Sequence, residues 1–379
     1  MLASLQDILD TVKSNTLTYQ QKLMCLGNIA ERLFDPRELL GYTDEEWQFL
    51  QNQMICDLNE GYAIYRPRYI LPDYNVYIKK GCEFLELPAP KNLDEALDGL
   101  LILYSHVPSI TTFPVYIGRL DMLLDPFITD EEQDYIKIKR FLNHVDKTVP
   151  DSFCHANIGP YDTKAGRLIL KAVIELEAPT PNMTIRYDKS KTSREFAELA
   201  AKACLLVSKP SFANDAYYIS DLGEQYGIAS CYNALPECGG AYTLTRLRLG
   251  TIARACKTVD EMVNELLPRV AKCALSTMDK RHKFVVEESN FFNTSFLEKE
   301  GFIKRTNFTG MFAIVGLADA ANHLLQQEGL NETFGKSQRG DEIATLIMDK
   351  LKEVTDNHEG VYAERTGNRY LLHAQVGAS

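Results

Sequence analysis

The residue best suited to chemistry in this sequence is Cys231, within the stretch YGIASCYNALPECGGAYTLTRLRL. A run with strand character leads into Cys231, a short loop follows, and a second such run begins after Gly239 and Gly240. Because glycine lets backbones approach closely, this loop can hold a thiol away from its flanking strands and point it into a cavity. A lone cysteine at a strand end more often serves packing. A thiolate nucleophile would also need a base, which the sequence does not identify.

Polar residues accompany this thiol in other strand-like runs. His155 and Asn157 lie in SFCHANIG, Asn233 follows Cys231 by two residues, and His373 and Gln375 lie in LLHAQVG. Two strings of the form H-A-polar at strand ends are expected to meet in an interior and form hydrogen bonds with a substrate. The alternative is that these side chains satisfy buried backbone groups. Both interpretations stand for His155 and His373, and the second is favoured for Gln375.

Other candidate motifs are weaker. GLNETFGKS, from Gly329, has one residue too many between its glycines for a phosphate loop and follows a helix, so we expect a connector. RTGNRY resembles a radical-glycine loop only loosely, and Gly367 is expected to be a turn residue. Arg246 and Glu288 are expected to be ordinary ion-pairing or surface residues. The nine cysteines include no C-x-x-C pair, so no metal site is predicted.

The elements that must position these residues alternate between strands and helices, which predicts an α/β architecture with largely buried strands. The strand-like runs lie near Val115, around His155, from Met183, before Asn233, from Ala241, from Met311 and from Tyr370. Four helix starts have capping-box spacing: Thr43 with Glu46, Thr129 with Glu132, Thr192 with Glu195, and Thr258 with Glu261. After Thr129, a stripe containing Ile136, Phe141, Leu142 and Val145 is expected to be buried. Residues 260–288 are expected to form one long helix or two.

Composition limits the partners. The chain has 379 residues, 45% of them hydrophobic, and a net charge of -11, which argues against a wide basic surface for nucleic acid or anionic lipid. The N-terminus lacks the pattern of a signal peptide, and no uncharged run is long enough to cross a bilayer. Unpaired, scattered cysteines favour a reducing cytoplasm.

Six blocks of this sequence resemble successive blocks of the YjjI family of glycyl radical enzymes, in that family's order. The blocks are ICDLNEGYAIYRPRYILPDY, LYSHVPSITTFPVYIGRLDMLLDPF, PDSFCHANIGP, YGIASCYNALP, GMFAIVGLADAANHLL and LLHAQVG. The resemblance runs from about Met54 to the last residue and is weak over residues 1–50. Family members are related to pyruvate formate-lyase and anaerobic ribonucleotide reductase.

The resemblance implies a barrel of two antiparallel half-barrels surrounded by helices, with a finger loop that carries the active cysteine, here Cys231. It also implies a separate activase that uses S-adenosylmethionine and an iron–sulfur cluster to install a glycyl radical. The resulting thiyl radical would abstract hydrogen from a small polar metabolite in anaerobic metabolism, with no other bound cofactor. We therefore expect a helical lobe over residues 1–110 and a barrel region over 111–379. A dimer is the usual arrangement among relatives.

The chain departs from the family at its end. Members carry a C-terminal loop of the R-V-x-G-Y type, whereas this sequence stops at Ser379. No radical-storing glycine is assigned, so we expect a barrel incomplete at the C-terminus and a chain inactive alone, with the glycine in missing or separate sequence. The alternatives are an enzyme like anaerobic ribonucleotide reductase, a non-catalytic remnant or binding protein, and a cysteine hydrolase. The substrate cannot be inferred from the sequence.

Overall fold

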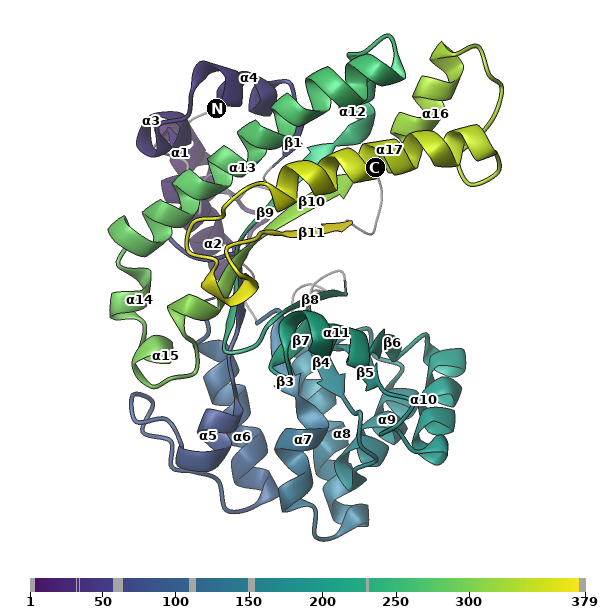
Figure 1. Cartoon of the computed structure of the whole chain (residues 1–379). Helices are drawn as coiled ribbons and strands as arrows, with labels where there is room; N and C mark the ends of the chain where they lie inside the picture. The colour runs from purple at the N-terminus through teal and green to yellow at the C-terminus, as the bar shows by residue number, and fades with distance from the viewer. Residues whose placement is uncertain are drawn as a thin grey trace.

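The computed structural model describes residues 4–31, 33, 35–56, 64–108, 114–148, 154–229 and 232–374. Over these residues the strands form two sheets and a two-stranded hairpin, with helices packed around them. Figure 1 shows the two sheets in separate halves of the view, with the hairpin β7–β8 between them. The α/β architecture predicted from the sequence is confirmed. None of the described helices is long and apolar enough to span a membrane.

The helices precede, separate and follow the strands. In chain order they are α1 (Leu5–Lys13), α2 (Tyr19–Glu31), α3 (Pro36–Leu40), α4 (Asp44–Gln51), α5 (Asn75–Lys80), α6 (Leu93–Ser105), α7 (Leu120–Leu124), α8 (Glu131–Thr148), α9 (Lys164–Leu176), α10 (Arg194–Val207), α11 (Asp215–Leu222), α12 (Leu249–Arg254), α13 (Leu267–Lys283), α14 (Phe291–Thr294), α15 (Phe296–Lys299), α16 (Leu317–Gln327) and α17 (Gln338–Asp356). Three short 3-10 turns are η1 (Asp125–Phe127), η4 (Arg305–Asn307) and η5 (Glu364–Thr366). Two π-helical segments, η2 (Glu261–Leu266) and η3 (Phe284–Glu288), flank α13, so residues 259–288 form one continuous helical run.

The first sheet is parallel, with the order β3 (Tyr116–Arg119), β4 (His155–Ile158), β5 (Asn182–Tyr187) and β6 (Ser211–Asn214). Helices lie between successive strands in the chain, as parallel pairing requires. Figure 1 shows α7 to α10 gathered around this sheet in the lower half of the view. Strands β3, β4 and β5 were predicted, whereas β6, with the short sequence SFAN, was not.

The second sheet is mixed and is built around β9 (Gly239–Arg248), β10 (Phe308–Val315) and β11 (Leu371–Ala374), which run parallel. The strands β1 (Ile55–Cys56) and β2 (Tyr69–Leu71) pair antiparallel with β9 along its other edge. These two N-terminal strands tie the beginning of the chain into the second sheet. The division into a helical lobe over residues 1–110 and a barrel region over 111–379 stays a prediction.

The two faces of this sheet have different neighbours, because successive side chains of a strand alternate. On the outer face, Leu247, Phe312 and Ile314 share a core with α13, α16 and α17. On the inner face, Leu244 and Met311 join the core that also covers the four-stranded sheet. The inner face is therefore directed toward the middle of the molecule.

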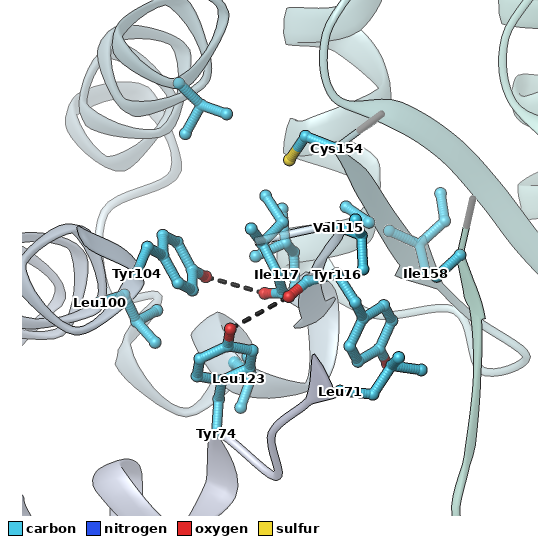
Figure 2. Packing of buried hydrophobic residues seen from close by; sticks show 14 of the residues in the cluster. Leu71, Tyr74, Leu100, Tyr104, Val115, Tyr116, Ile117, Leu123, Cys154 and Ile158 are labelled. Atoms are coloured by element: carbon cyan, nitrogen blue, oxygen red, sulfur yellow. Dashed lines mark hydrogen bonds between the residues drawn. The ribbon is translucent and has the colours of Figure 1, made fainter. Parts of the chain in front are cut away.

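The edge strand β3 is held from its side by two buried tyrosines (Figure 2). The hydroxyl of Tyr74 donates to the backbone oxygen of Tyr116 at 3.0 Å, and that of Tyr104 donates to the backbone oxygen of Ile117 at 2.8 Å. The two rings meet edge to face, with centroids 5.0 Å apart. The phenolic groups thus give the β3 carbonyls partners in a region closed to water.

The four helices begin where the sequence predicted, but in two of them the capping residue differs from the predicted threonine. Thr43 and Glu46 form the expected capping box, and Thr258 accepts from the backbone N–H of Glu261. Before α8 the cap is Asp130, and before α10 it is Ser193, each one residue after the predicted threonine. Ile136 was expected in the buried stripe of α8, but its side chain is exposed, because it lies on the opposite face of the helix, about half a turn from the centre of the buried positions.

Candidate functional site

The hairpin of β7 (Tyr226–Ala229) and β8 (Asn233–Pro236) is the centre of the candidate site. Ala229 pairs with Asn233, so the chain joins the two strands through three residues, of which Cys231 is the central one. Cys231 itself lies outside the described residues, and its predicted burial stays a prediction. The residue after it, Tyr232, adopts a left-handed conformation with φ 64°, which costs energy for a bulky side chain.

The hairpin lies against both sheets at a position where only glycine fits. A Cβ atom on Gly227 would lie 2.7 Å from Cζ of Tyr116 in β3 and 3.1 Å from Cδ2 of Leu71 in β2. Real Cβ atoms do not approach this closely. The absence of a side chain on Gly227 therefore lets β7 pack between the two sheets, and Leu71 and Tyr116 fix its position.

Asn157 of β4 binds the backbone of this hairpin at two points. Its side-chain nitrogen donates to the backbone oxygen of Ile228 at 2.9 Å, and its side-chain oxygen accepts from the backbone N–H of Ile228 at 2.8 Å. Asn157 is fully buried. One amide group thus replaces the strand that would otherwise satisfy this edge of β7.

Arg186 of β5 holds the start of the same strand. Its guanidinium forms a buried ion pair with Asp215 at 2.8 Å and donates to the backbone oxygens of Tyr226 and Glu224 at 3.2 and 3.3 Å. The guanidinium carbon also lies 3.8 Å from the centre of the Tyr226 ring. The Tyr226 hydroxyl donates to Asp215 at 2.8 Å, which closes the network. Hence β4 and β5 each contribute one polar side chain that orients β7.

His155, the first residue of β4, lies beside the turn that contains Cys231. Its ring meets that of Tyr232 edge to face, with centroids 5.5 Å apart. The side chain is only 2% exposed, and Nδ1 has no hydrogen-bond partner among the described residues. Burial, with a smaller contribution from the positive charge of Lys209, lowers the pKa of His155 to about 4. The imidazole is therefore neutral near pH 7.

A buried carboxyl group lies at the other end of the hairpin. Burial and the charge of Asp73 raise the pKa of Glu237 to about 7, and the Tyr116 hydroxyl donates to it at 3.2 Å. Glu237 follows β8 directly. Within the described residues no group of three His, Cys, Asp or Glu side chains is arranged to hold a metal ion.

The structure brings some of the predicted site residues together and places others apart. His155, Asn157 and Asn233 gather on the hairpin and the adjacent β4, with Asn233 half-buried as the closing residue of the turn. His373 belongs to β11 of the second sheet, and Gln375 lies outside the described residues. Leu371, two positions before His373 and on the same face, packs against a small buried cluster that includes Tyr226 and Ile228 of the hairpin. The H-A-N string begins β4, although it was expected to end a strand.

Two arginines were missed by the sequence reasoning. Arg186 lies in a predicted strand, MTIRYD, where a charged residue among apolar neighbours was a signal of a buried ion pair. Arg246 was expected to be an ion-pairing or surface residue. It is half-buried on the inner face of β9, in register with Ala313 and His373 on the two neighbouring strands. It forms no ion pair with any residue that the structure describes, whereas Glu288 is exposed as expected.

The chain is similar in sequence to one protein family over most of its length. A family described as "Glycyl radical enzyme YjjI-like" matches residues 17–379. An uncharacterized protein of Haemophilus influenzae is 92% identical over 379 residues, which are 100% of this chain and 74% of that protein. The uncharacterized protein YjjI of Escherichia coli is 42% identical over 371 residues, covering 97% of this chain and 71% of that protein. The match begins closer to the N-terminus than Met54, where the resemblance was expected to start.

Solved structures with low sequence identity share the fold. An anaerobic ribonucleotide reductase has a TM-score of 0.73 at 11% identity, covering 98% of this chain and 68% of that one. Hydroxyproline dehydratase of Clostridioides difficile, with trans-4-hydroxy-L-proline bound, has a TM-score of 0.65 at 12% identity. The match covers 98% of this chain and 70% of the dehydratase chain. The barrel architecture expected from the sequence is thereby supported at the level of fold.

The bidentate contact of Asn157 leads to the first prediction. Replacing Asn157 by Ala should destabilise the protein, because the N–H and the C=O of Ile228 would each lose a partner at about 1–3 kcal/mol. Urea unfolding measures this loss, with Asn264→Ala as the control, since Asn264 is exposed and its side chain donates to the exposed Asp260. Equal stability of the two variants would contradict the role given to Asn157.

The low pKa of His155 leads to a second prediction. Its pKa is about 4 in the folded protein against 6.5 for the free side chain, so between these values the unfolded chain binds more protons. The wild-type protein should therefore lose stability relative to His155→Gln as the pH falls from about 6.5 to about 4. Measuring the free energy of unfolding of both proteins across this pH range tests the prediction. A difference between the two free energies that stays constant with pH would refute the buried, neutral imidazole.

Proposed function

The chain belongs to the YjjI-like glycyl radical enzyme family, and from this premise we propose that Cys231 abstracts hydrogen atoms from a small polar metabolite as a thiyl radical. The observation that carries the proposal is the hairpin fixed between the two sheets by Asn157 and Arg186. In the sequence, Cys231 lies two residues after Ala229, which ends β7, and two residues before Asn233, which begins β8. A reactive thiol needs such a rigid support.

The proposed chemistry conserves atoms and electrons over a cycle. A glycyl radical, when present, supplies the unpaired electron. Cys231 would give its thiol hydrogen atom to that glycyl radical and become a thiyl radical, which would take a hydrogen atom from a substrate C–H bond. It would return a hydrogen atom to the product radical and then recover its own from the glycine, which restores the glycyl radical. No general base takes part in these steps. The low pKa of His155, about 4, agrees with this chemistry, because such an imidazole is a weak base near neutral pH. A cysteine hydrolase would need a stronger base, so the low pKa disfavours that alternative.

The surrounding polar residues divide into two roles. We propose that His155, Asn233, His373 and Gln375 bind substrate. Both polar atoms of the Asn157 amide are engaged by Ile228, so Asn157 acts by positioning the hairpin instead of contacting the substrate.

We further propose that a separate activase, which uses S-adenosylmethionine and an iron–sulfur cluster, installs the radical on a glycine. The setting proposed is anaerobic metabolism in the cytoplasm, with a homodimer as the assembly. Gly367 is not assigned as this glycine, since it caps the turn η5 in a left-handed conformation with φ 64°. No other glycine of these 379 residues is assigned to the radical.

A second candidate is a reductase like anaerobic ribonucleotide reductase, which the fold similarity at a TM-score of 0.73 favours. An identity of 11% supports the fold alone. The two candidates differ in substrate, because the second requires a ribonucleotide. A non-catalytic binding protein would show no turnover of either.

Replacing Cys231 by Ser tests the proposal. The natural gene product that contains these residues is activated anaerobically with its activase, S-adenosylmethionine and reductant, then incubated with a metabolite extract and, separately, with ribonucleotides. Turnover should fall below detection in Cys231→Ser, because an O–H bond is too strong for hydrogen-atom transfer to a glycyl radical. Cys204→Ser is the matched control, since Cys204 lies on α10, outside the hairpin. Retained turnover in Cys231→Ser would exclude Cys231 as the site of the radical.

A further inference from the structure

A cavity of about 460 Å³ lies at the carboxyl ends of β9 and β10. Three arginines line it, Arg246 and Arg248 from the end of β9 and Arg254 from α12. The other lining residues are Cys56, Gly250, Thr251, Val315, Gly316 and Asp319. Three guanidinium groups in one cavity are notable in a chain whose net charge is -11.

Each of these arginines donates to an acceptor other than a carboxylate among the residues that the structure describes. Arg246 donates to the sulfur of Cys56 at 3.5 Å, Arg248 to the side-chain oxygen of Gln53, and Arg254 to the hydroxyl of Thr251 at 3.4 Å. None of these three acceptors is a carboxylate. In the part of the chain that the structure describes, none of the three forms an ion pair. Asp319 is the one acidic residue of the lining, so three positive charges face one negative charge.

The local fold keeps the cavity open and adds backbone donors. Each of the two parallel strands runs into a helix, β9 into α12 and β10 into α16, and these helices lie side by side (Figure 1). Gly316 precedes α16 and provides no side-chain cap, so the first N–H groups of this helix lack intrahelical partners. A Cβ on Gly250 would lie 3.3 Å from Nη1 of Arg254. Glycine at this position leaves that guanidinium accessible.

Several lining residues of the cavity lie on the inner face of the second sheet. Arg246 is in register with Ala313 and His373, and Arg248 is in register with Val315, which also lines the cavity. Side chains in register across parallel strands lie on the same face. The arginines therefore lie on the face that carries His373 and Leu371, and Leu371 packs against the cluster that includes the hairpin residues Tyr226 and Ile228.

We propose that this cavity binds the phosphate group of a phosphate monoester, and that the substrate of the thiyl chemistry carries this group. The charge of the lining supports a dianion, because three arginines and Asp319 sum to two positive charges. A phosphate monoester carries close to two negative charges near pH 7, whereas a carboxylate carries one. Guanidinium groups also match phosphate oxygens with paired donors. The link to a substrate rests on the proposed function, but the phosphate site itself does not.

Titration calorimetry with inorganic phosphate at low ionic strength tests the site without any radical activation. Wild-type protein should bind phosphate. Acetate should bind to it at least about tenfold more weakly than phosphate does. Arg246→Gln, Arg248→Gln and Arg254→Gln should each weaken phosphate binding about tenfold, the effect of losing roughly one charge-assisted hydrogen bond. Arg194→Gln is the control, since Arg194 is exposed and paired with Glu198 on α10.

The conservative variant Arg254→Lys distinguishes the effect of the paired guanidinium hydrogen bonds from the effect of positive charge alone. It keeps the charge at an exposed position but loses the paired donors, so it should also bind phosphate more weakly than wild type. No phosphate binding by wild type, or phosphate binding by all three glutamine variants that is as tight as in wild type, would overturn the site. Acetate binding as tightly as phosphate would overturn its assignment to a dianion. Failure of the Cys231→Ser test would remove the thiyl proposal and leave these binding results untouched.

Discussion

The backbone of β7 imposes the constraint on which the arrangement of the site depends. One edge of this strand pairs with β8, while at Tyr226 and Ile228 the other edge is satisfied by side chains. An unpaired buried N–H or C=O group costs about 1–3 kcal/mol. A hairpin enclosed between two sheets therefore requires polar side chains at fixed points of the neighbouring strands. Asn157 and Arg186 meet this requirement from β4 and β5, and Asp215 compensates the buried charge of Arg186.

The same constraint explains how the strands of the hairpin are held by buried polar side chains of the neighbouring sheet. At Gly227, the hairpin packs against Tyr116 of one sheet and Leu71 of the other. His155 adds a neutral imidazole beside the turn, and the second sheet adds positive charge at the far end of its inner face. In the proposed function the hairpin supplies the radical chemistry, and the arginines supply the affinity for an anionic group. The two tasks are thus assigned to the hairpin and to the end of the second sheet.

Much of this fold follows from local sequence patterns, and the remainder depends on tertiary contacts. Runs such as MTIRYD and MFAIVG became strands because their apolar, β-branched residues suit a buried sheet. The strand β6 was missed since SFAN has no such pattern, and it is a strand because it pairs with β5. The position of Arg246 also could not be read locally, as it depends on the register of β9 against β10 and β11. Asn157 was predicted as a site residue, but its engagement by Ile228 required knowing where the hairpin lies.

The central claim is that the thiol of Cys231 exchanges hydrogen atoms with the radical glycine. The α-hydrogen of a glycyl radical splits its electron paramagnetic resonance signal into a doublet, and a thiol hydrogen exchanges with solvent. In the activated natural gene product transferred to deuterated water, the account predicts that the wild-type doublet collapses to a singlet as Cys231 delivers deuterium to the glycine. The doublet should persist in Cys231→Ser. A wild-type doublet that survives, or a collapse that is equally fast in Cys231→Ser, would contradict the account.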